Sequence, residues 1–382
     1  MKNIKQNSGM SLIELMISIA IGSMLMIGLV TTFKTSSDNY RELQKASDLI
    51  ENGRYAMDVL YNDIRHAGYY GHYQANDLTY PTVAPDPCEL TNTTNLLNAL
   101  AVPIQAFSSA TPATMASTGC DELGFFTSTN DLKPGSDVIV IRRADTALFA
   151  GTNAAATTLE PTTSSAADRT TTDGEVYIQS NSRSADIQIA TNEVEVNPLD
   201  LTTSAKTADN ATPTLQKMPS KTTATWADTR KLRVHIYYLS QCEAATLCAS
   251  TDTPTLKRLE LGPDGSGGTK MNIVPLVAGI EHFKIEYGLD TTPTSVDVTT
   301  GNVGDGIPDS YVSAPTLAQS EDIVAIRASV LARSLKTTNG YTDSKSFTVG
   351  PDNLAAAGDA YKRNVYTTEI RTNNLAGRRE IP

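Results

Sequence analysis

The sequence has few aromatic residues, no CxxC cysteine pair and only one long apolar run. Aromatic residues make up 6% of the 382 residues, and the cysteines number four. Basic residues are also in deficit, with 31 Lys and Arg against 42 Asp and Glu, which gives a formal net charge of −11. This deficit argues against a broad basic surface for nucleic acid, because phosphate affinity comes mainly from Lys and Arg. The remaining composition is acidic and Thr-rich, which favours a mostly β protein.

The one long apolar run, MSLIELMISIAIGSMLMIGLV, covers residues 10–30. Its 21 residues are enough for a membrane-spanning helix, which needs about 20. The preceding segment is short and polar and contains Lys2 and Lys5 but no acid. We therefore expect this end to stay in the cytoplasm and everything after Val30 to be exported.

Three interpretations fit an apolar run at this position. A secretory signal peptide needs a small-residue cleavage site after the run, and the following TTFKTSSDNY has none. A plain single-span anchor does not explain Glu14, because a carboxylate inside a membrane segment costs about 2.5–3.5 kcal/mol unless it has a partner or a function. The third interpretation is a leader that is cleaved before the apolar run.

The segment GMSLIELMISIAIG resembles the type IV prepilin motif, in which Gly, a hydrophobic residue, a small polar residue, Leu, Ile, Glu and Leu precede an apolar run. The resemblance implies that a prepilin peptidase cuts between Gly9 and Met10 and that the new amine of Met10 is methylated. Glu14 is then expected to be a subunit-registration carboxylate that pairs with this cationic amine, since an unpaired charge in an apolar bundle is costly. The alternative is a tolerated Glu that reaches water at the membrane surface.

The helix is expected to continue beyond the membrane through residues 31–68. The sequence contains no Pro before Pro81, so nothing forces a break, and Gly68 can take the left-handed conformation that ends a helix. One face with alternating spacings of three and four is mostly apolar or amphipathic. Its members are Tyr40, Leu43, Ser47, Ile50, Arg54, Met57, Tyr61 and Ile64. We expect the second half of this face to pack on the chain's own sheet and the first half to pack on other subunits.

Residues 51–71, ENGRYAMDVLYNDIRHAGYYG, resemble the helix end of PilW-type minor pilins. The resemblance implies a globular β-rich domain and membership of a small complex that starts and caps the pilus. It also implies that other minor pilins, the major pilin, the prepilin peptidase and the inner-membrane assembly platform are partners.

Alternating apolar and polar residues after Gly71 predict a series of strands. The expected strands are 136–144, 231–240, 256–262, 283–287, 322–334 and 364–372. Such alternation suits antiparallel strands with one solvated face, so that Arg233, His235 and Tyr237 would lie opposite an apolar face. Such a sheet packed on the long helix gives an α+β fold, in agreement with the pilin resemblance.

The segment from about 145 to 230 differs from its surroundings because it is rich in Ala, Thr and Ser and poorly periodic. We expect a large insertion on the sheet, partly loop, with short strand-like pieces at EVYIQS and EVEV. The expected organisation is a cleaved leader (1–9), a transmembrane and filament-core helix (10–30), an amphipathic continuation (31–68) and a periplasmic globular domain (69–382).

The four cysteines, Cys88, Cys120, Cys242 and Cys248, all follow the apolar run, on the side where disulfides persist. Four cysteines allow three connectivities, of which sequence proximity favours Cys88–Cys120 and Cys242–Cys248. Four thiolates on one metal ion are the rival interpretation, but the spacing does not fit the usual zinc patterns.

Two glycine-rich segments carry weak motifs. GPDGSGGTK (262–270) lacks the order of a phosphate loop, and a hairpin loop is expected there. NVGDGIPDSY (302–311) resembles the core of a calcium loop through Asp305 and Asp309, but it lacks the earlier acids, so we prefer a polar turn with calcium as the alternative. No HExxH, GxSxG or Cys/His pattern is present, so we expect no enzyme, no cofactor and no catalytic residue.

The resemblance to PilW-type minor pilins therefore implies a minor pilin that helps initiate type IV pilus assembly and so supports twitching motility, adhesion or DNA uptake. The expected location is the inner membrane, as a single-pass protein, and then the pilus at the cell surface. The alternatives are a minor pseudopilin of a type II secretion system and a tip adhesin that uses the insertion as its contact surface.

Overall fold

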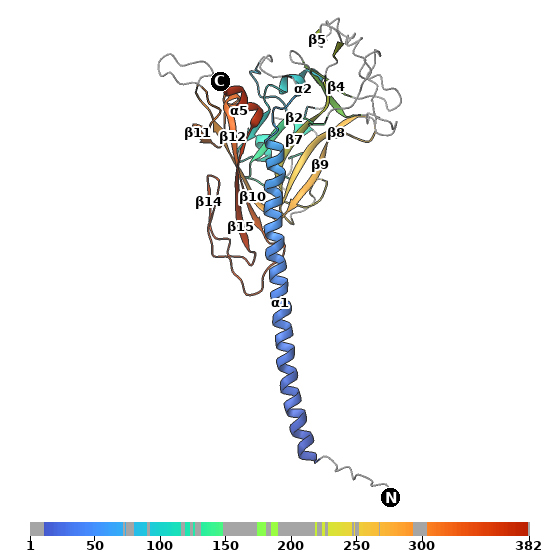
Figure 1. Cartoon of the computed structure of the whole chain (residues 1–382), viewed down its shortest axis with the longest axis vertical. Helices are drawn as coiled ribbons and strands as arrows, with labels where there is room; N and C mark the ends of the chain where they lie inside the picture. The colour runs from blue at the N-terminus through green and yellow to red at the C-terminus, as the bar shows by residue number, and fades with distance from the viewer. Residues whose placement is uncertain are drawn as a thin grey trace.

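A long helix that enters a head of two antiparallel sheets dominates the computed structural model (Figure 1). The helix, α1 (Leu12–Ile64), begins far from the head, and the C-terminal helix α5 (Asn373–Arg379) lies at the opposite end of the molecule. This arrangement confirms the predicted α+β class. The structure describes residues 11–71, 73, 80–89, 92–115, 119–122, 125–126, 131–147, 174–180, 185–189, 218–219, 224–225, 228–246, 248, 252–266, 268–292 and 304–380.

Local sequence explains both ends of α1. Ser11 is the N-cap residue, and its backbone N–H donates to the Glu14 carboxylate at 3.1 Å. The 53 residues that follow give a helix of about 80 Å. The helix ends at Ile64 and a turn leads to Gly68, which has a φ of +72° and donates its N–H to the carbonyl oxygen of Arg142 at 3.0 Å. The helix therefore stops four residues before the expected boundary, while Gly68 has the left-handed conformation that was predicted.

The first sheet has seven strands, and β7 (Asp228–Ser240) is central to it. The order is β1 (Ile104–Phe107), β2 (Val138–Ala144), β7, β3 (Val176–Ser180) and β4 (Ala185–Ile189); β8 (Thr255–Pro263) pairs with β7, and β9 (Thr269–Ala278) pairs with β8. The β8–β9 hairpin confirms the predicted hairpin at GPDGSGGTK, whereas β9 itself was not predicted.

The second sheet has four strands and forms the other wall of the head. Its order is β11 (Ser310–Val312), β10 (Ile280–Leu289), β12 (Ile323–Arg333) and β15 (Arg363–Arg371). The smaller elements are α2 (Thr93–Ala99), α3 (Pro112–Met115), α4 (Gly119–Glu122), η3 (Ala318–Asp322), and the hairpins β5 (Met218–Pro219)–β6 (Ala224–Thr225) and β13 (Phe347–Val349)–β14 (Asp352–Leu354).

All six predicted strands are present, as β2, β7, β8, β10, β12 and β15. EVYIQS forms β3, which pairs with both β4 and β7. EVEV and most of the predicted 145–230 insertion lie outside the described residues.

Two apolar cores lie on the two faces of the first sheet. The inner core joins the buried side of α1 to both sheets through residues such as Leu60, Ile139 and Phe283. The outer core packs α2 and the loops after α1 on the opposite face, with Tyr70 and Ile236 among its members. The expected solvated face of β7 is therefore wrong: α1 and the second sheet cover it and bury His235 and Tyr237.

Gly53 allows α1 to lie close to β15. The Tyr366 ring lies against this glycine, and a Cβ atom added to Gly53 would overlap the ring. The Tyr366 hydroxyl donates to the carbonyl oxygen of Leu49 at 3.4 Å, which holds the ring in place. A small residue at this position therefore sets the distance between the helix and the strand.

Replacing Gly53 by Ala is expected to destabilise the head by about 1–3 kcal/mol, because the ring or the helix must shift. The measurement is thermal unfolding of the full chain in detergent, followed by circular dichroism. Gly377→Ala in α5 is the matched control, since no atom lies within 4 Å of a Cβ added there. We expect this variant to lose no thermal stability. Equal melting temperatures for Gly53→Ala and Gly377→Ala would contradict this account of the contact.

Candidate functional site

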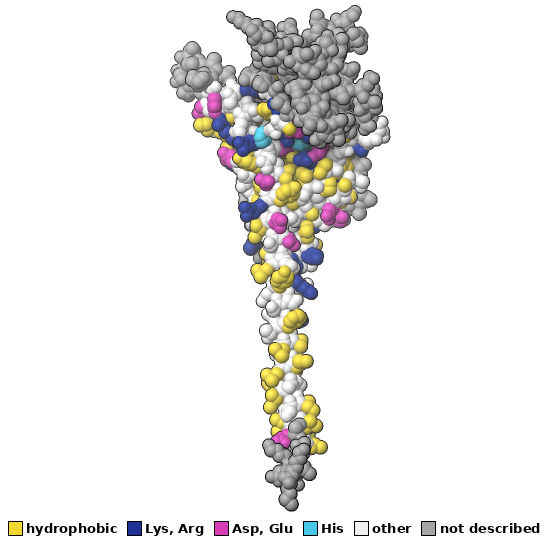
Figure 2. Space-filling model, turned by 45° about the vertical axis from the view of Figure 1, so that its right-hand side comes forward, with side chains coloured by type: hydrophobic (Ala, Val, Ile, Leu, Met, Phe, Trp, Pro, Cys, Tyr) yellow, Lys and Arg dark blue, Asp and Glu magenta, His cyan; other side chains and the backbone are white. Residues whose placement is uncertain are grey.

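The first part of α1 is an apolar rod that projects from the head (Figure 2). Its large hydrophobic side chains are all exposed: Leu12, Ile13, Leu15, Met16, Ile17, Ile19, Ile21, Met24, Leu25, Met26, Ile27, Leu29, Val30 and Phe33. By length and composition, α1 is the one helix among the described residues that could cross a membrane. A helix that is apolar on every side needs a membrane or a bundle of other helices around it.

Glu14 is the only ionisable residue in residues 11–33. Its carboxylate turns back toward the start of α1 and accepts the Ser11 N–H. There it adjoins the positive end of the helix dipole. Gly9 and Met10 lie outside the described residues, but Met10 directly precedes Ser11 in the chain. A new amine at Met10 would therefore be next to the residue that Glu14 already contacts.

The part of α1 inside the head turns a different face to the core from the one that the sequence predicted. The buried residues are Leu49, Gly53, Ala56, Leu60, Asp63 and Ile64, whereas Tyr40, Leu43, Ile50, Arg54 and Tyr61 are exposed. The prediction that the second half of the Tyr40–Ile64 face packs on the chain's own sheet is confirmed at Ile64 and in part at Met57, which is partly buried against the inner core, and is wrong at Arg54 and Tyr61. The physical reason is that small residues, Gly53 and Ala56, admit the strands more closely than large ones do.

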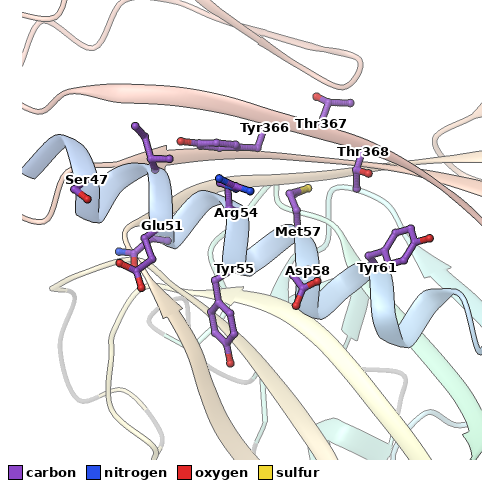
Figure 3. A pocket seen from close by; sticks show the side chains of 12 residues that line it. Ser47, Glu51, Arg54, Tyr55, Met57, Asp58, Tyr61, Tyr366, Thr367 and Thr368 are labelled. Carbon is purple, nitrogen blue, oxygen red and sulfur yellow. The ribbon is translucent and has the colours of Figure 1, made fainter.

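A groove runs between this exposed side of α1 and β15 (Figure 3). Its volume is about 940 Å³, and both polar and apolar side chains line it, among them Ile50, Arg54 and Tyr61 from the helix and Tyr366 and Thr368 from the strand. The exposed side of α1 in the head is therefore a mixed polar and apolar surface, unlike the rod.

Asp63 attaches the end of α1 to the first sheet through a buried polar cluster. Its Oδ1 accepts from Arg143 Nε at 2.5 Å, and its Oδ2 accepts from His235 Nδ1 at 2.6 Å and from the Tyr237 hydroxyl at 2.9 Å. Asp63 is 4% exposed, His235 5% and Tyr237 0%. An ionised carboxylate only accepts, so the imidazole places its proton on Nδ1. Every carboxylate oxygen is thus satisfied although the group is removed from water.

The charges in this cluster set its protonation. Burial tends to raise the pKa of Asp63, but the attraction and hydrogen bonds of His235 and Arg143 outweigh burial and hold that pKa below its ordinary value. Burial lowers the pKa of His235, so the imidazole is neutral at pH 7. The cluster therefore carries one carboxylate balanced mainly by the Arg143 guanidinium.

A second contact ties the exposed part of α1 to the loop between β12 and β15. Glu42 accepts from Lys45 at 2.7 Å, from Lys362 at 2.9 Å and from Thr338 at 3.0 Å. The hydrogen bonds from Lys45 and Lys362 lower the pKa of Glu42 to about 2. These side chains are only partly buried, and ion pairs near the surface stabilise little, so the contact orients the helix more than it stabilises the fold.

The structure contains both disulfides that sequence proximity favoured. Cys88 pairs with Cys120, and Cys242 pairs with Cys248. The first joins the segment after α1 to α4 beside the outer core, and the second closes a short loop after β7.

Asp305 and Asp309 have local hydrogen-bonding roles. Asp309 Oδ2 accepts from the Thr291 N–H at 2.8 Å and from the Thr291 hydroxyl at 3.0 Å, and Asp305 accepts from the Ile307 N–H at 2.9 Å. The described part of the chain holds no group of three or more His, Cys, Asp or Glu that could bind a metal ion. The calcium site stays a sequence prediction.

Sequence reasoning missed the Asp63 cluster. The available signal was the position of Asp63, three residues after Leu60 on a face whose earlier members are Ala56 and Gly53. The partner residues could not be found in this way, because β2 and β7 are distant in the chain and only the fold brings them to the helix.

Two sequence profiles match the chain. One, described as Type IV Pilus-assembly protein W, matches residues 236–374, and the other, described as Prokaryotic N-terminal methylation motif, matches residues 4–30. Among solved structures, a type IV-like pilin from Thermus thermophilus is similar over 53% of this chain and 83% of that chain, with 13% sequence identity and a TM-score of 0.22. A comparison with curated proteins finds no match.

Proposed function

We propose that this chain, a type IV pilus protein of the PilW-like family by its two profile matches, is a minor pilin that helps initiate pilus assembly in a tip or priming complex. The observation that carries the proposal is the exposed apolar rod with one carboxylate at its start. A rod of this kind is suited to two successive environments, the bilayer and a bundle of pilin helices.

Maturation would begin at the N-terminus. A prepilin peptidase would remove residues 1–9 and the amine of Met10 would be methylated, which the match to the methylation motif supports. Lys2 and Lys5 would keep the leader in the cytoplasm, so that the head, with its two disulfides, would fold in the periplasm. The protein would then be a single-pass inner-membrane protein until it enters the pilus.

Registration would follow from the charge of Glu14. In an apolar bundle, the positive amine of one subunit and the carboxylate of the same or a neighbouring subunit are each unfavourable alone and favourable as a pair. The ion pair therefore stabilises one axial position of an incoming subunit relative to the others. Other minor pilins, the major pilin and the inner-membrane assembly platform are the proposed partners.

A deletion strain tests the assembly role. We expect loss of surface pili, with the major pilin retained in the membrane, and recovery when the full chain is supplied on a plasmid. The readouts are electron microscopy and the amount of major pilin in the sheared fraction, and export of secreted proteins is measured in the same cultures. Normal piliation with impaired export would instead identify a pseudopilin of a type II secretion system, and normal results in both would exclude an assembly role.

A further inference from the structure

A buried lysine lies against one of the two disulfides. The Lys257 side chain comes from β8, the residue is 1% exposed, and its Nζ lies 3.3 Å from Cys242 Sγ and 3.6 Å from Cys248 Sγ. Among the described residues, these two sulfurs are its only hydrogen-bond partners, and no carboxylate lies within ion-pair distance of it. A disulfide sulfur is a weak acceptor, so this ammonium is poorly compensated while the bond is intact.

A second donor reaches the same sulfurs. The Ser240 hydroxyl is fully buried and lies 3.1 Å from Cys248 Sγ and 3.9 Å from Cys242 Sγ. The charged groups that act on Lys257 are Asp131 and Asp252, and burial nevertheless lowers the pKa of its amine. The Lys257 ammonium and the Ser240 hydroxyl thus face the two sulfurs. A thiolate would accept hydrogen bonds from these donors far better than the disulfide does.

A carboxylate lies beside both disulfides, since Asp131 accepts from the Cys248 N–H at 2.5 Å, but among the described residues only Cys242–Cys248 has an ammonium against its sulfurs. Near Cys88–Cys120 the neighbouring charge is the carboxylate of Asp86, which accepts from the Cys88 N–H at 3.0 Å and from the Gly119 N–H at 2.9 Å. A carboxylate disfavours a thiolate, and no described ammonium offsets it at Cys88–Cys120, so this bond is expected to be inert. Cys88–Cys120 is therefore an internal control for the reactivity of Cys242–Cys248.

We propose that Cys242–Cys248 is a thiol–disulfide exchange site that reacts with dithiols and that Lys257 stabilises the thiolate of Cys242 when the bond opens. A thiolate of the dithiol attacks Cys248 Sγ, because Cys248 is the more exposed residue of the pair, at 8% against 3% for Cys242. The S–S bond breaks, and its electron pair leaves on Cys242 Sγ beside the ammonium.

The second thiol of the reductant then loses its proton and attacks the mixed disulfide. Cys248 is released and takes up a proton, and the dithiol leaves as its own disulfide, so that two electrons pass from the dithiol to the protein. A leaving thiolate of lower pKa departs faster and makes the disulfide more easily reduced. This inference does not depend on the pilus role.

The test is a redox titration of the full chain in detergent with reduced and oxidised dithiothreitol, with alkylation and mass spectrometry to quantify each cysteine pair. We expect Cys242–Cys248 to be reduced at a lower ratio of reductant to oxidant than Cys88–Cys120. Lys257→Met, which keeps the side-chain volume and removes the charge, should raise the required ratio about tenfold, which corresponds to about one pKa unit. Lys257→Arg should restore the wild-type value.

The rate of alkylation as a function of pH separates this role from a purely structural one. In the reduced wild-type protein, Cys242 should titrate below the ordinary thiol pKa of about 8.5, and in Lys257→Met it should return to about that value. A variant that simply folds less well would lose its disulfide more easily, which is the opposite direction. An unchanged reduction midpoint and an unchanged Cys242 pKa in Lys257→Met would overturn the proposal.

Discussion

Replacing Glu14 by Gln is expected to leave the chain in the membrane but to exclude it from assembled filaments. Gln preserves the size of the side chain and its ability to accept the Ser11 N–H, so α1 should begin at the same residue. Only the charge is lost. In an apolar bundle the amine of Met10 would then have no counter-charge, and removing one partner of a buried ion pair costs about 3–5 kcal/mol.

A loss of about 3 kcal/mol corresponds to more than a hundredfold in an equilibrium, since about 1.4 kcal/mol is tenfold. The measurement is the ratio of this chain in sheared pili to this chain in the membrane fraction, by immunoblot. Glu321→Gln, an exposed residue in η3, is the matched control and should leave the ratio unchanged. If Glu14→Gln is incorporated as well as wild type, Glu14 has no registration role.

Replacing Asp63 by Asn is expected to loosen the joint between α1 and the first sheet. Asn cannot neutralise Arg143, whose Nε lies 2.5 Å from the Asp63 carboxylate, and it cannot accept through both terminal atoms. An uncompensated guanidinium in the cluster costs about 3–5 kcal/mol. The melting temperature of the head should fall by about 10 °C.

Asp58→Asn is the control, since this residue lies five positions earlier on the exposed side of the same helix, and its effect should stay within about 0.5 kcal/mol. The comparison uses thermal unfolding of the full chain at pH 7. Similar melting temperatures for the two variants would mean that Asp63 does not anchor the helix.

The pH dependence of this difference follows from the direction of the pKa shift. In the folded state the pKa of Asp63 lies below its ordinary value of 3.8, so its contribution is present above about pH 4 and is lost as the pH falls through the folded pKa. His235 has a lowered pKa, so protonation in acid opposes folding in the same direction. The gap between wild type and Asp63→Asn should therefore be wide at pH 7 and shrink under acid conditions.

The elements that depend on local pattern could be predicted from the sequence. The apolar run, the absence of Pro before Pro81 and the left-handed Gly68 define α1, and alternation defines six strands. Nearby cysteines were favoured as pairs, and the structure pairs them in that way. These features are set by neighbours in the chain.

Features that depend on contacts between distant segments could not be predicted. Periodicity placed Arg54 and Tyr61 in the half of the face that packs on the chain's own sheet, whereas the sheet packs against Gly53 and Ala56 because small residues permit a closer approach. The alternating pattern placed His235 and Tyr237 on the solvated side of a strand, whereas α1 covers them in the structure. The polarity that misled the prediction is what binds the Asp63 carboxylate.

The N-terminal peptide of the protein extracted from pili or membranes tests the central claim most directly. Its mass, measured after proteolysis, should correspond to a chain that begins at Met10 and carries one added methyl group on the amine. Such a terminus is the positive charge that Glu14 is proposed to neutralise. A peptide that still begins at Met1, or a chain trimmed beyond Val30, would contradict the account.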